Sequence, residues 1–446
     1  MTYKKCSPDL VRVCLLLAVT LLAPTASAEW KEKVLYSFQG GSNDGSLPVG
    51  GVVFDKQGNL YGATMNGGMV YQLAPPAKQG GTWTETVLYV FQGNTSGDGA
   101  TPEGGLVIDG AGNLYGTTAY GGTGNCVLLG ILVGCGTVYE VSPPKQKGGP
   151  WIETVLYSFP TAKEGYFPWG DLVFDSSGNL YGATEFGGGF GTACNGFYQY
   201  CGAVFELSPP KTKGSKWKEK VLHGFKSGKD GANPNGGLVF DSKGIIYGTT
   251  YAGGTQGCTY QGFAGCGTAF KLEPPSRKGG AWTEKQLHVF TGGSDGANPA
   301  GSLVFGSKGS LYGTAQGGNS SGGGIVFRLT AANAGRWKET VLHWFSNSGP
   351  GASLAGLLCN SVGILYGTTI GGDSERYGSV FRLKPPGRKR GAWILDLLYG
   401  FAGSPDGAYP EAQLIFDRGS LFATTRGGGT GSTCSGYCGT VFEVSP

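Results

Sequence analysis

A unit opened by tryptophan recurs seven times along the chain, and this repeat constrains the fold more than any other feature. The seven tryptophans are Trp30, Trp83, Trp151, Trp217, Trp282, Trp337 and Trp393. The fourth unit shows the pattern: WKEKVLHGF, KDGANPNGG, LVFDSKG, IIYGTT, a variable loop and GTAFKLEPP. Because the units fill residues 29–446, we expect one repeat domain over that range.

Each unit contains four short runs with the residue pattern of β-strands. Residues 153–159 and 113–118 alternate between polar and apolar, residues 237–241 are continuously apolar, and residues 439–444 close a unit. Four strands in about 50–65 residues, repeated in tandem, are typical of a β-propeller blade. A strand that is apolar on both faces is buried on both, so we place residues 237–241 and their equivalents innermost.

The predicted fold is all-β, a seven-bladed β-propeller of four-stranded blades. The tryptophan run would then form the outer strand of the preceding blade, which leaves residues 30–38 without a blade of their own. We expect this N-terminal strand to pair with residues 439–444 and close the ring, which also removes exposed strand edges. An open solenoid of the same units is the alternative.

The repeat motif resembles that of a known family. LVFDSSGNLYGAT followed by GAVFELSPP is similar to the repeat of the choice-of-anchor GloVer-repeat proteins, and the similarity extends over all seven units. The resemblance implies an exported protein of unestablished function, held to the cell by one of several anchors. The strand pair resembles NHL-type propeller repeats more weakly.

Residues 1–28 have the features of a secretory signal peptide. Lys4, Lys5 and Arg12 precede a short apolar run at 15–23, and Ala-Ser-Ala follows at 26–28. The apolar run is too short for a membrane span, although an uncleaved anchor is the alternative. We expect a secreted, extracytoplasmic protein without a transmembrane segment. Cleavage lowers the formal net charge from +4 to +2, so nothing indicates nucleic acid as a partner.

Cysteines gather in the variable loops. Four pairs lie within single loops: Cys126 and Cys135, Cys194 and Cys201, Cys258 and Cys266, and Cys434 and Cys438. In an oxidising compartment these spacings predict four local disulfides that order long, glycine-rich loops. Cys359 stands in an innermost strand, where we expect a buried free thiol.

The histidines do not indicate a catalytic centre. His223, His288 and His343 occupy a repeat position that holds tyrosine in the other blades, so we interpret them as framework. No catalytic residue, metal site or cofactor is predicted from them, although carboxylate catalysis stays open because acidic residues are spread around the ring. The repeated Asp-Gly pairs are interpreted as turns rather than as a cation-binding ring.

Departures from the repeat mark the predicted binding site. The third unit replaces Asp-Gly-Ala-Asn-Pro-x-Gly-Gly by a segment that contains Glu164, Tyr166, Phe167, Trp169 and Asp171. The variable loops of the third and fourth units add further aromatic residues on the same face, among them Tyr198 and Tyr251. Aromatic rings beside carboxylates suit recognition of sugars or peptides, whereas packing of the loops on one another is the alternative.

Three functions are compatible with these features. We favour a non-enzymatic, cell-surface or secreted binding or interaction module, acting as a monomer on a glycan, a cell-envelope polymer or another protein. An extracellular carboxylate-dependent hydrolase or lyase acting on polysaccharide is the first alternative, and an architectural envelope protein is the second. Basic residues in the Pro-Pro loops of the opposite face are interpreted as solvated, with an anionic surface as the other reading.

Overall fold

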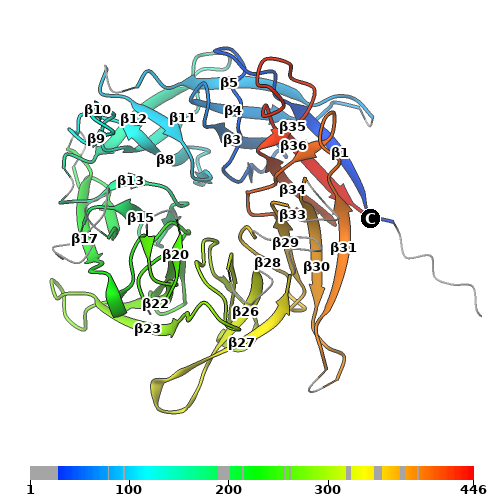
Figure 1. Cartoon of the computed structure of the whole chain (residues 1–446). Coiled ribbons are helices and arrows are strands. Elements are labelled where there is room, and N and C mark those ends of the chain that lie inside the picture. The colour runs from blue at the N-terminus through cyan, green and yellow to red at the C-terminus, as the bar shows by residue number, and fades with distance from the viewer. Residues whose placement is uncertain are drawn as a thin grey trace, which may run out of the picture.

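The computed structural model is a seven-bladed β-propeller arranged as a closed ring (Figure 1). It describes residues 29–446 except 79, 94–95, 162, 189–200, 213–214, 255–256, 261–262, 318–322, 346–353, 372–376 and 389–390. The predicted signal peptide therefore lies outside the described residues. Within them, no helix has the length and apolar character that crossing a membrane requires.

Each blade is an antiparallel sheet of four main strands, ordered from the centre of the ring outwards. The innermost strands are β2 (Val53–Phe54), β7 (Val107–Ile108), β14 (Val173–Phe174), β18 (Val239–Phe240), β24 (Val304–Phe305), β28 (Leu358–Cys359) and β33 (Ile415–Asp417). The second strands are β3 (Leu60–Thr64), β8 (Leu114–Gly121), β15 (Leu180–Phe186), β19 (Ile246–Thr250), β25 (Leu311–Ala315), β29 (Leu365–Thr369) and β34 (Ser420–Thr425).

The two outer strands of each blade contain six to eight residues. The third strands are β4 (Met69–Ala74), β11 (Thr137–Ser142), β16 (Ala203–Ser208), β22 (Thr268–Glu273), β26 (Ile325–Ala331), β30 (Ser379–Lys384) and β36 (Thr440–Ser445). The outermost are β5 (Thr84–Val90), β12 (Ile152–Ser158), β17 (Lys218–Gly224), β23 (Thr283–Val289), β27 (Trp337–Trp344), β31 (Ile394–Gly400) and β1 (Lys31–Ser37).

Short elements decorate this framework. The segments that lead into blades 2, 3 and 7 form β6 (Gly99–Pro102), β13 (Tyr166–Pro168) and β32 (Gly407–Ala408), which pair with β8, β15 and β35 (Gly427–Gly428). Two hairpins lie in variable loops: β9 (Val127–Leu128) with β10 (Ile131–Leu132), and β20 (Thr259–Tyr260) with β21 (Phe263–Ala264). Three single 3₁₀ turns are η1 (Gly228–Asp230), η2 (Ser307–Gly309) and η3 (Asn333–Gly335).

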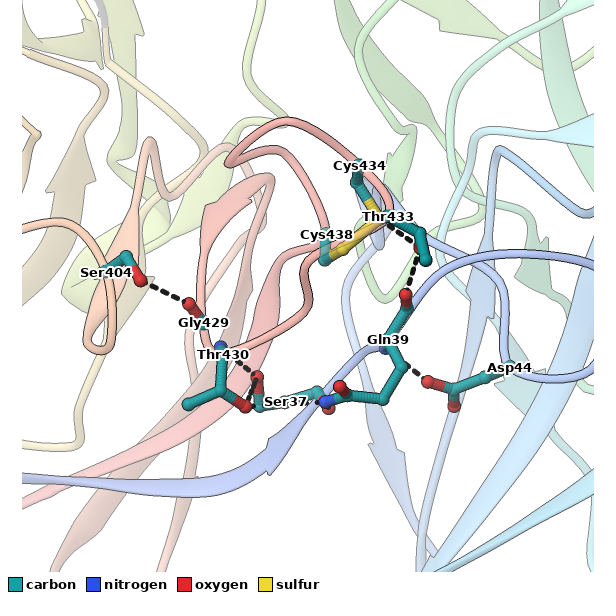
Figure 2. The surroundings of a disulfide bond; sticks show 9 residues. All are labelled: Ser37, Gln39, Asp44, Ser404, Gly429, Thr430, Thr433, Cys434 and Cys438. Carbon is teal, nitrogen blue, oxygen red and sulfur yellow. Dashed lines mark hydrogen bonds between the residues drawn. A yellow bond between two sulfur atoms is a disulfide. The ribbon is translucent and has the colours of Figure 1, made fainter.

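Ring closure follows the sequence prediction. The N-terminal strand β1 pairs antiparallel with β36, from Lys31 opposite Ser445 to Ser37 opposite Thr440. Thr430 donates its backbone N–H to the Ser37 hydroxyl at 2.6 Å, beside the Cys434–Cys438 disulfide (Figure 2). The last blade is therefore built from both ends of the repeat domain.

The hydrophobic core lies between blades rather than in one central mass. One aromatic pair crosses each of the seven interfaces, with ring centroids 4.8–5.3 Å apart. These pairs are Phe38–Tyr71, Phe91–Tyr139, Phe159–Phe205, Phe225–Phe270, Phe290–Phe327, Phe345–Phe381 and Phe401–Phe442. The glycine of each Leu-Tyr-Gly run is required by this packing, because a Cβ on Gly62 would lie 2.3 Å from the Tyr71 hydroxyl.

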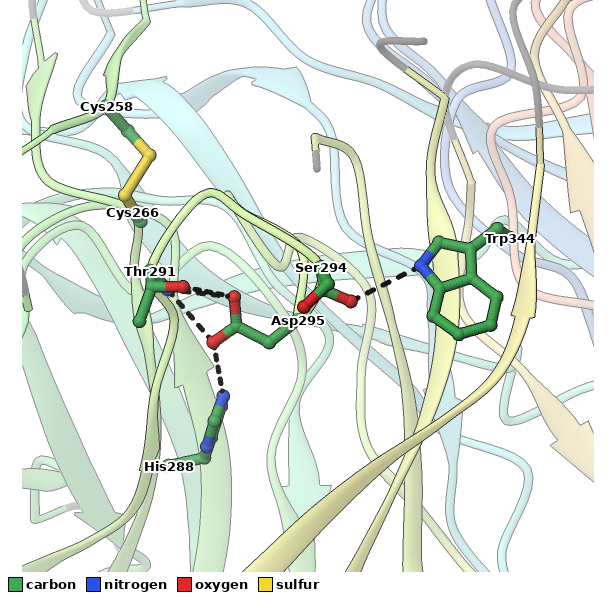
Figure 3. Close-up of polar contacts among 7 residues, drawn as sticks. All are labelled: Cys258, Cys266, His288, Thr291, Ser294, Asp295 and Trp344. Atoms are coloured by element: carbon green, nitrogen blue, oxygen red, sulfur yellow. Dashed lines mark hydrogen bonds and ion pairs between the residues drawn. A yellow bond between two sulfur atoms is a disulfide. The ribbon is translucent and has the colours of Figure 1, made fainter. Parts of the chain in front are cut away.

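The outer strands are clasped to the next blade through the Asp-Gly turns. Tyr36, Tyr89 and Tyr399 donate their hydroxyls to Asp44, Asp98 and Asp406, whereas His223 and His288 contact Asp230 and Asp295 at 3.0 and 3.1 Å. Figure 3 shows Asp295 also accepting hydrogen bonds from Thr291. These contacts agree with interpreting the histidines as framework and the aspartates as turn residues.

Two expectations need adjustment in detail. The innermost strands contain two or three paired residues each, and these residues are half-buried, or exposed at Phe416, rather than fully buried as expected. Cys359 is a free cysteine as predicted, but its side chain is half-buried rather than enclosed.

Three of the four predicted disulfides are present: Cys126–Cys135, Cys258–Cys266 and Cys434–Cys438. Cys201 is disulfide-bonded as well. Its predicted partner, Cys194, lies outside the described residues.

Candidate functional site

A cavity of about 710 Å³ lies at the centre of the ring and is lined by residues from all seven blades. Each blade lines it mainly through the segment before its innermost strand, and six also contribute a residue at or just after the C-terminal end of the second strand. We call the residue after proline in that segment, or its equivalent, the rim position. It holds Val49, Glu103, Trp169, Asn235, Ala300, Leu354 and Glu411.

The rim position is held by a left-handed backbone turn two residues earlier. Leu47, Thr101, Phe167, Asn233, Asn298 and Tyr409 all have φ between 54° and 59°. Four of these residues donate their N–H to a disulfide cysteine of the preceding blade, as Phe167 does to the Cys135 carbonyl at 3.1 Å. Each such disulfide loop therefore positions the cavity-lining segment of the next blade.

Two glutamates, one buried and one half-buried, face the cavity from neighbouring blades. Glu103 occupies the rim position of blade 2 with 8% of its surface exposed, and Glu185 lies within β15 of blade 3. Burial, followed by repulsion from Glu185, raises the pKa of Glu103 to about 8. Burial raises the pKa of Glu185 to about 7. Both carboxyl groups therefore exchange protons near neutral pH.

The part of the cavity wall that blade 7 supplies carries an ion pair. Arg426 Nη1 lies 3.1 Å from Glu411 Oε1, and both side chains are partly exposed to the cavity. Arg426 occupies in blade 7 the position that Glu185 occupies in blade 3, and Glu411 the one that Glu103 occupies in blade 2. Among the described residues that line the cavity, Arg426 is the one basic side chain.

Asp171 joins two blades at the cavity wall. Its Oδ1 accepts a hydrogen bond from the Gly105 backbone N–H at 2.5 Å, and burial raises the pKa of its carboxyl. Ser302 makes the equivalent contact with the Gly237 N–H at 2.9 Å. Asp171 therefore stabilises an interface between blades as well as facing the cavity.

Two aromatic residues contribute to the cavity wall. Trp169 stands at the rim position of blade 3 with 39% of its surface exposed. Tyr251 is buried, and its hydroxyl lies 3.4 Å from the side-chain oxygen of Gln316 in the next blade. A large exposed ring next to carboxyl and amide groups offers an apolar platform with directional partners.

The sequence model of the Gloeobacter/Verrucomicrobia repeat matches residues 23–258 and 189–442. The chain belongs to this repeat family. No curated protein has a sequence that matches it. The resemblance identified from the repeat motif is thus confirmed.

Solved structures are similar to this family member in fold. A catalytically inactive virginiamycin B lyase from Staphylococcus aureus, solved with quinupristin, is 14% identical with a TM-score of 0.52, covering 94% of this chain and 100% of that one. The pyranose dehydrogenase PQQ domain from Coprinopsis cinerea is 12% identical with a TM-score of 0.46, covering 94% and 96%. A gluconolactonase from Xanthomonas campestris is 15% identical with a TM-score of 0.37, covering 69% and 78%. At these identities the likeness concerns the fold alone.

The predicted site residues of this family member divide into three groups. Trp169, Asp171 and Tyr251 line the cavity together. Tyr166 and Phe167 are buried instead, with Phe167 packed edge-to-face on Tyr120 at 4.8 Å. Glu164 accepts a hydrogen bond from the Thr161 hydroxyl in an exposed loop, and Tyr198 lies outside the described residues.

Sequence reasoning missed four charged residues of the cavity. These are Glu103, Glu185, Glu411 and Arg426. Aligning the seven units position by position would have found them, because each replaces a neutral residue that most other blades carry. No group of three or more histidine, cysteine, aspartate or glutamate residues in the described part of the chain is arranged to hold a metal ion.

The β9–β10 hairpin is also exposed. Val127, Leu129, Ile131 and Leu132 each keep 56–73% of their surface accessible.

Proposed function

We propose that the protein is an exported, non-enzymatic binding module that takes a small polar ligand, or the end of a glycan chain, into its central cavity. The observation that carries the proposal is the cavity lining. The seven interfaces repeat one aromatic pair each, whereas the rim position holds a different residue in nearly every blade. Residues that vary within a regular scaffold are free to serve a ligand.

The chemistry of the lining supports a hydroxyl-rich ligand. Trp169 offers a ring face, and Asn235, Gln316 and Asp171 offer amide and carboxyl groups in the same cavity. Cavities of about 300–1,000 Å³ hold small molecules, and 710 Å³ falls in that range. The predicted signal peptide and the disulfides support export, because disulfides persist in oxidising compartments.

The test is a binding screen of the mature protein, residues 29–446, against glycans and cell-envelope fragments, followed by calorimetry on hits. Trp169→Ala should weaken binding at least tenfold. Trp344→Ala is the matched control, because Trp344 is 49% exposed on β27 and does not line the cavity. Equal affinities for the wild type and Trp169→Ala would exclude the cavity as the binding site.

A second candidate is carboxylate-dependent cleavage of a polysaccharide. The pair Glu103 and Glu185 favours it, because pKa values of about 8 and 7 leave one carboxyl able to donate a proton and the other able to accept one near neutral pH. Incubation with polysaccharides and measurement of new reducing ends or unsaturated products tests it. Product formation that disappears in Glu103→Gln would replace the binding-only proposal with an enzyme.

A further inference from the structure

The cavity wall carries more acidic side chains than basic ones. Four carboxyl groups line it, from Glu103, Asp171, Glu185 and Glu411, and Arg426 is their one basic counterpart among the described lining residues. The guanidinium of Arg426 already forms an ion pair with Glu411 at 3.1 Å. The three carboxyl groups on blades 2 and 3 thus form no ion pair with a basic side chain of the described cavity wall, although the charge of Arg426 lowers the pKa of Glu103.

Glu103 is the most unusual of these groups. More than nine-tenths of its surface is buried, it lines the cavity, and its carboxyl makes no hydrogen bond within the described part of the chain. Buried polar side chains are normally hydrogen-bonded. Because Glu103 lines the cavity, a donor for its carboxyl can enter from there.

A second acceptor in the same cavity also lacks a donor. The side-chain oxygen of Asn235, at the rim position of blade 4, is buried and has no hydrogen-bond partner among the described residues. Glu103 and Asn235 flank the Trp169 position, since the three rim positions belong to consecutive blades. The cavity wall between blades 2 and 4 thus combines two unpaired acceptors with one exposed aromatic ring.

We propose that the ligand presents a protonated primary amine to Glu103 and Glu185, with Trp169 beside it, so that a glycan ligand carries a free amino sugar. This rests on the proposed binding function. An ammonium group supplies three donors and one positive charge, which the wall lacks, and it gains attraction from an aromatic face. An acetylated amine or a plain hydroxyl supplies donors without the charge.

Ionisation of the site supports this choice. Bringing an ammonium next to Glu103 and Glu185 favours their charged forms, so binding near pH 7 releases protons. Glu411 and Asp171 add to the negative charge that the ammonium meets, whereas Arg426 opposes it. Proton release is measurable by calorimetry in two buffers that differ in ionisation enthalpy.

The experiment compares chitosan disaccharide with its fully acetylated counterpart on the mature protein at pH 7. The free amine should bind at least tenfold more tightly. Glu103→Gln and Glu185→Gln should remove that preference while keeping the melting temperature, because glutamine has the same shape. Glu206→Gln is the matched control, since Glu206 lies on β16 and is held by the Ser208 hydroxyl outside the cavity.

The outcomes separate this inference from the proposed function. Equal or tighter binding of the acetylated sugar, or of an acidic sugar, overturns the amine and leaves the binding function standing. Stabilisation by calcium chloride alone that is lost in both glutamine variants overturns it in favour of a metal ion. Absence of binding for every sugar tested, with none found in the wider glycan and envelope-fragment screen, overturns the binding function itself.

Discussion

The outer clasps and the central cavity are two concentric regions built from the same repeat, and they differ in how strictly they repeat. At the outer edge, a tyrosine or histidine meets an aspartate of the next blade in five of the interfaces, at 2.6–3.1 Å. At the centre, the rim position changes from valine to glutamate to tryptophan. Contacts that every interface needs are thus repeated in the blades. Residues that differ from blade to blade, as at the rim position, serve a need that the molecule has only once.

A row of glutamates also repeats around the outer region. Six outermost strands carry a glutamate two residues after the tryptophan, and each has one buried carboxyl oxygen without a hydrogen-bond partner in the described residues. They are Glu32, Glu85, Glu153, Glu219, Glu284 and Glu339. Burial is the main cause that raises their pKa values to about 7–8.

Removing one outermost strand should cause the largest loss of stability. Deleting residues 29–38 takes away β1 together with Leu35 and Phe38, which are buried between blades 7 and 1. We expect a loss larger than the about 3–5 kcal/mol of a single buried phenylalanine, seen as an unfolded or aggregated product in circular dichroism. Lys31→Ala, at an exposed position of the same strand, should fold normally. A deletion variant that melts like the wild type would refute closure by β1.

A change of pH tests the outer region as a whole. The six glutamates have folded pKa values above the ordinary 4.5, so their protonated forms stabilise the fold. This stability is fully present below about pH 4.5 and is lost as pH rises through 7–8. Because the side chains are partly solvated, we expect about 0.5 kcal/mol each, or about 3 kcal/mol in all, from urea titrations at pH 5 and pH 8.5. Changing all six to glutamine should flatten the profile, and a wild type more stable at pH 8.5 than at pH 5 would contradict the assignment.

The Cys126–Cys135 disulfide tests whether a variable loop positions the cavity-lining segment of the next blade. Replacing Cys126 and Cys135 by serine opens a short loop, which costs about 2–3 kcal/mol, and loosens the carbonyl that holds Phe167. Because Trp169 follows two residues later, ligand affinity should fall about tenfold. The same replacement at Cys258 and Cys266 should lower stability similarly but spare affinity, since the segment it supports carries Ala300 at the rim. Equal losses of affinity in both variants would argue against local positioning.

The smallest effect on stability and binding is expected at the repeat position where some units carry histidine and others tyrosine. The triple variant His223→Tyr, His288→Tyr and His343→Tyr should stay within about 0.5 kcal/mol of the wild type and bind ligand unchanged. Thermal melts and calorimetry check this beside Trp169→Ala, which should lose binding at nearly constant melting temperature. Loss of function in the triple variant, with binding kept in Trp169→Ala, would move the site to the outer region.

Periodicity made the framework predictable, because one interface contact occurs many times and any two blades reveal it. The β1–β36 pairing and the exchange of histidine for tyrosine could be read from the sequence for this reason. Glu103 was missed because a single carboxylate inside an ordinary Pro-x-Gly-Gly segment has no signature until the fold brings Glu185 beside it. Phe167 was predicted to belong to the binding site. Its left-handed backbone instead turns the ring onto Tyr120 and away from the cavity.

Closure by β1 has a consequence for the order in which the molecule is made. The strand synthesised first in the repeat domain acquires its partner, β36, only when the last repeat has been translated. While the chain is synthesised, the apolar side chains of β1 must therefore stay unpaired as six blades assemble, a long-range pairing of the kind that slows folding. We expect chains that end before residue 440 to remain sensitive to proteases and to need a chaperone.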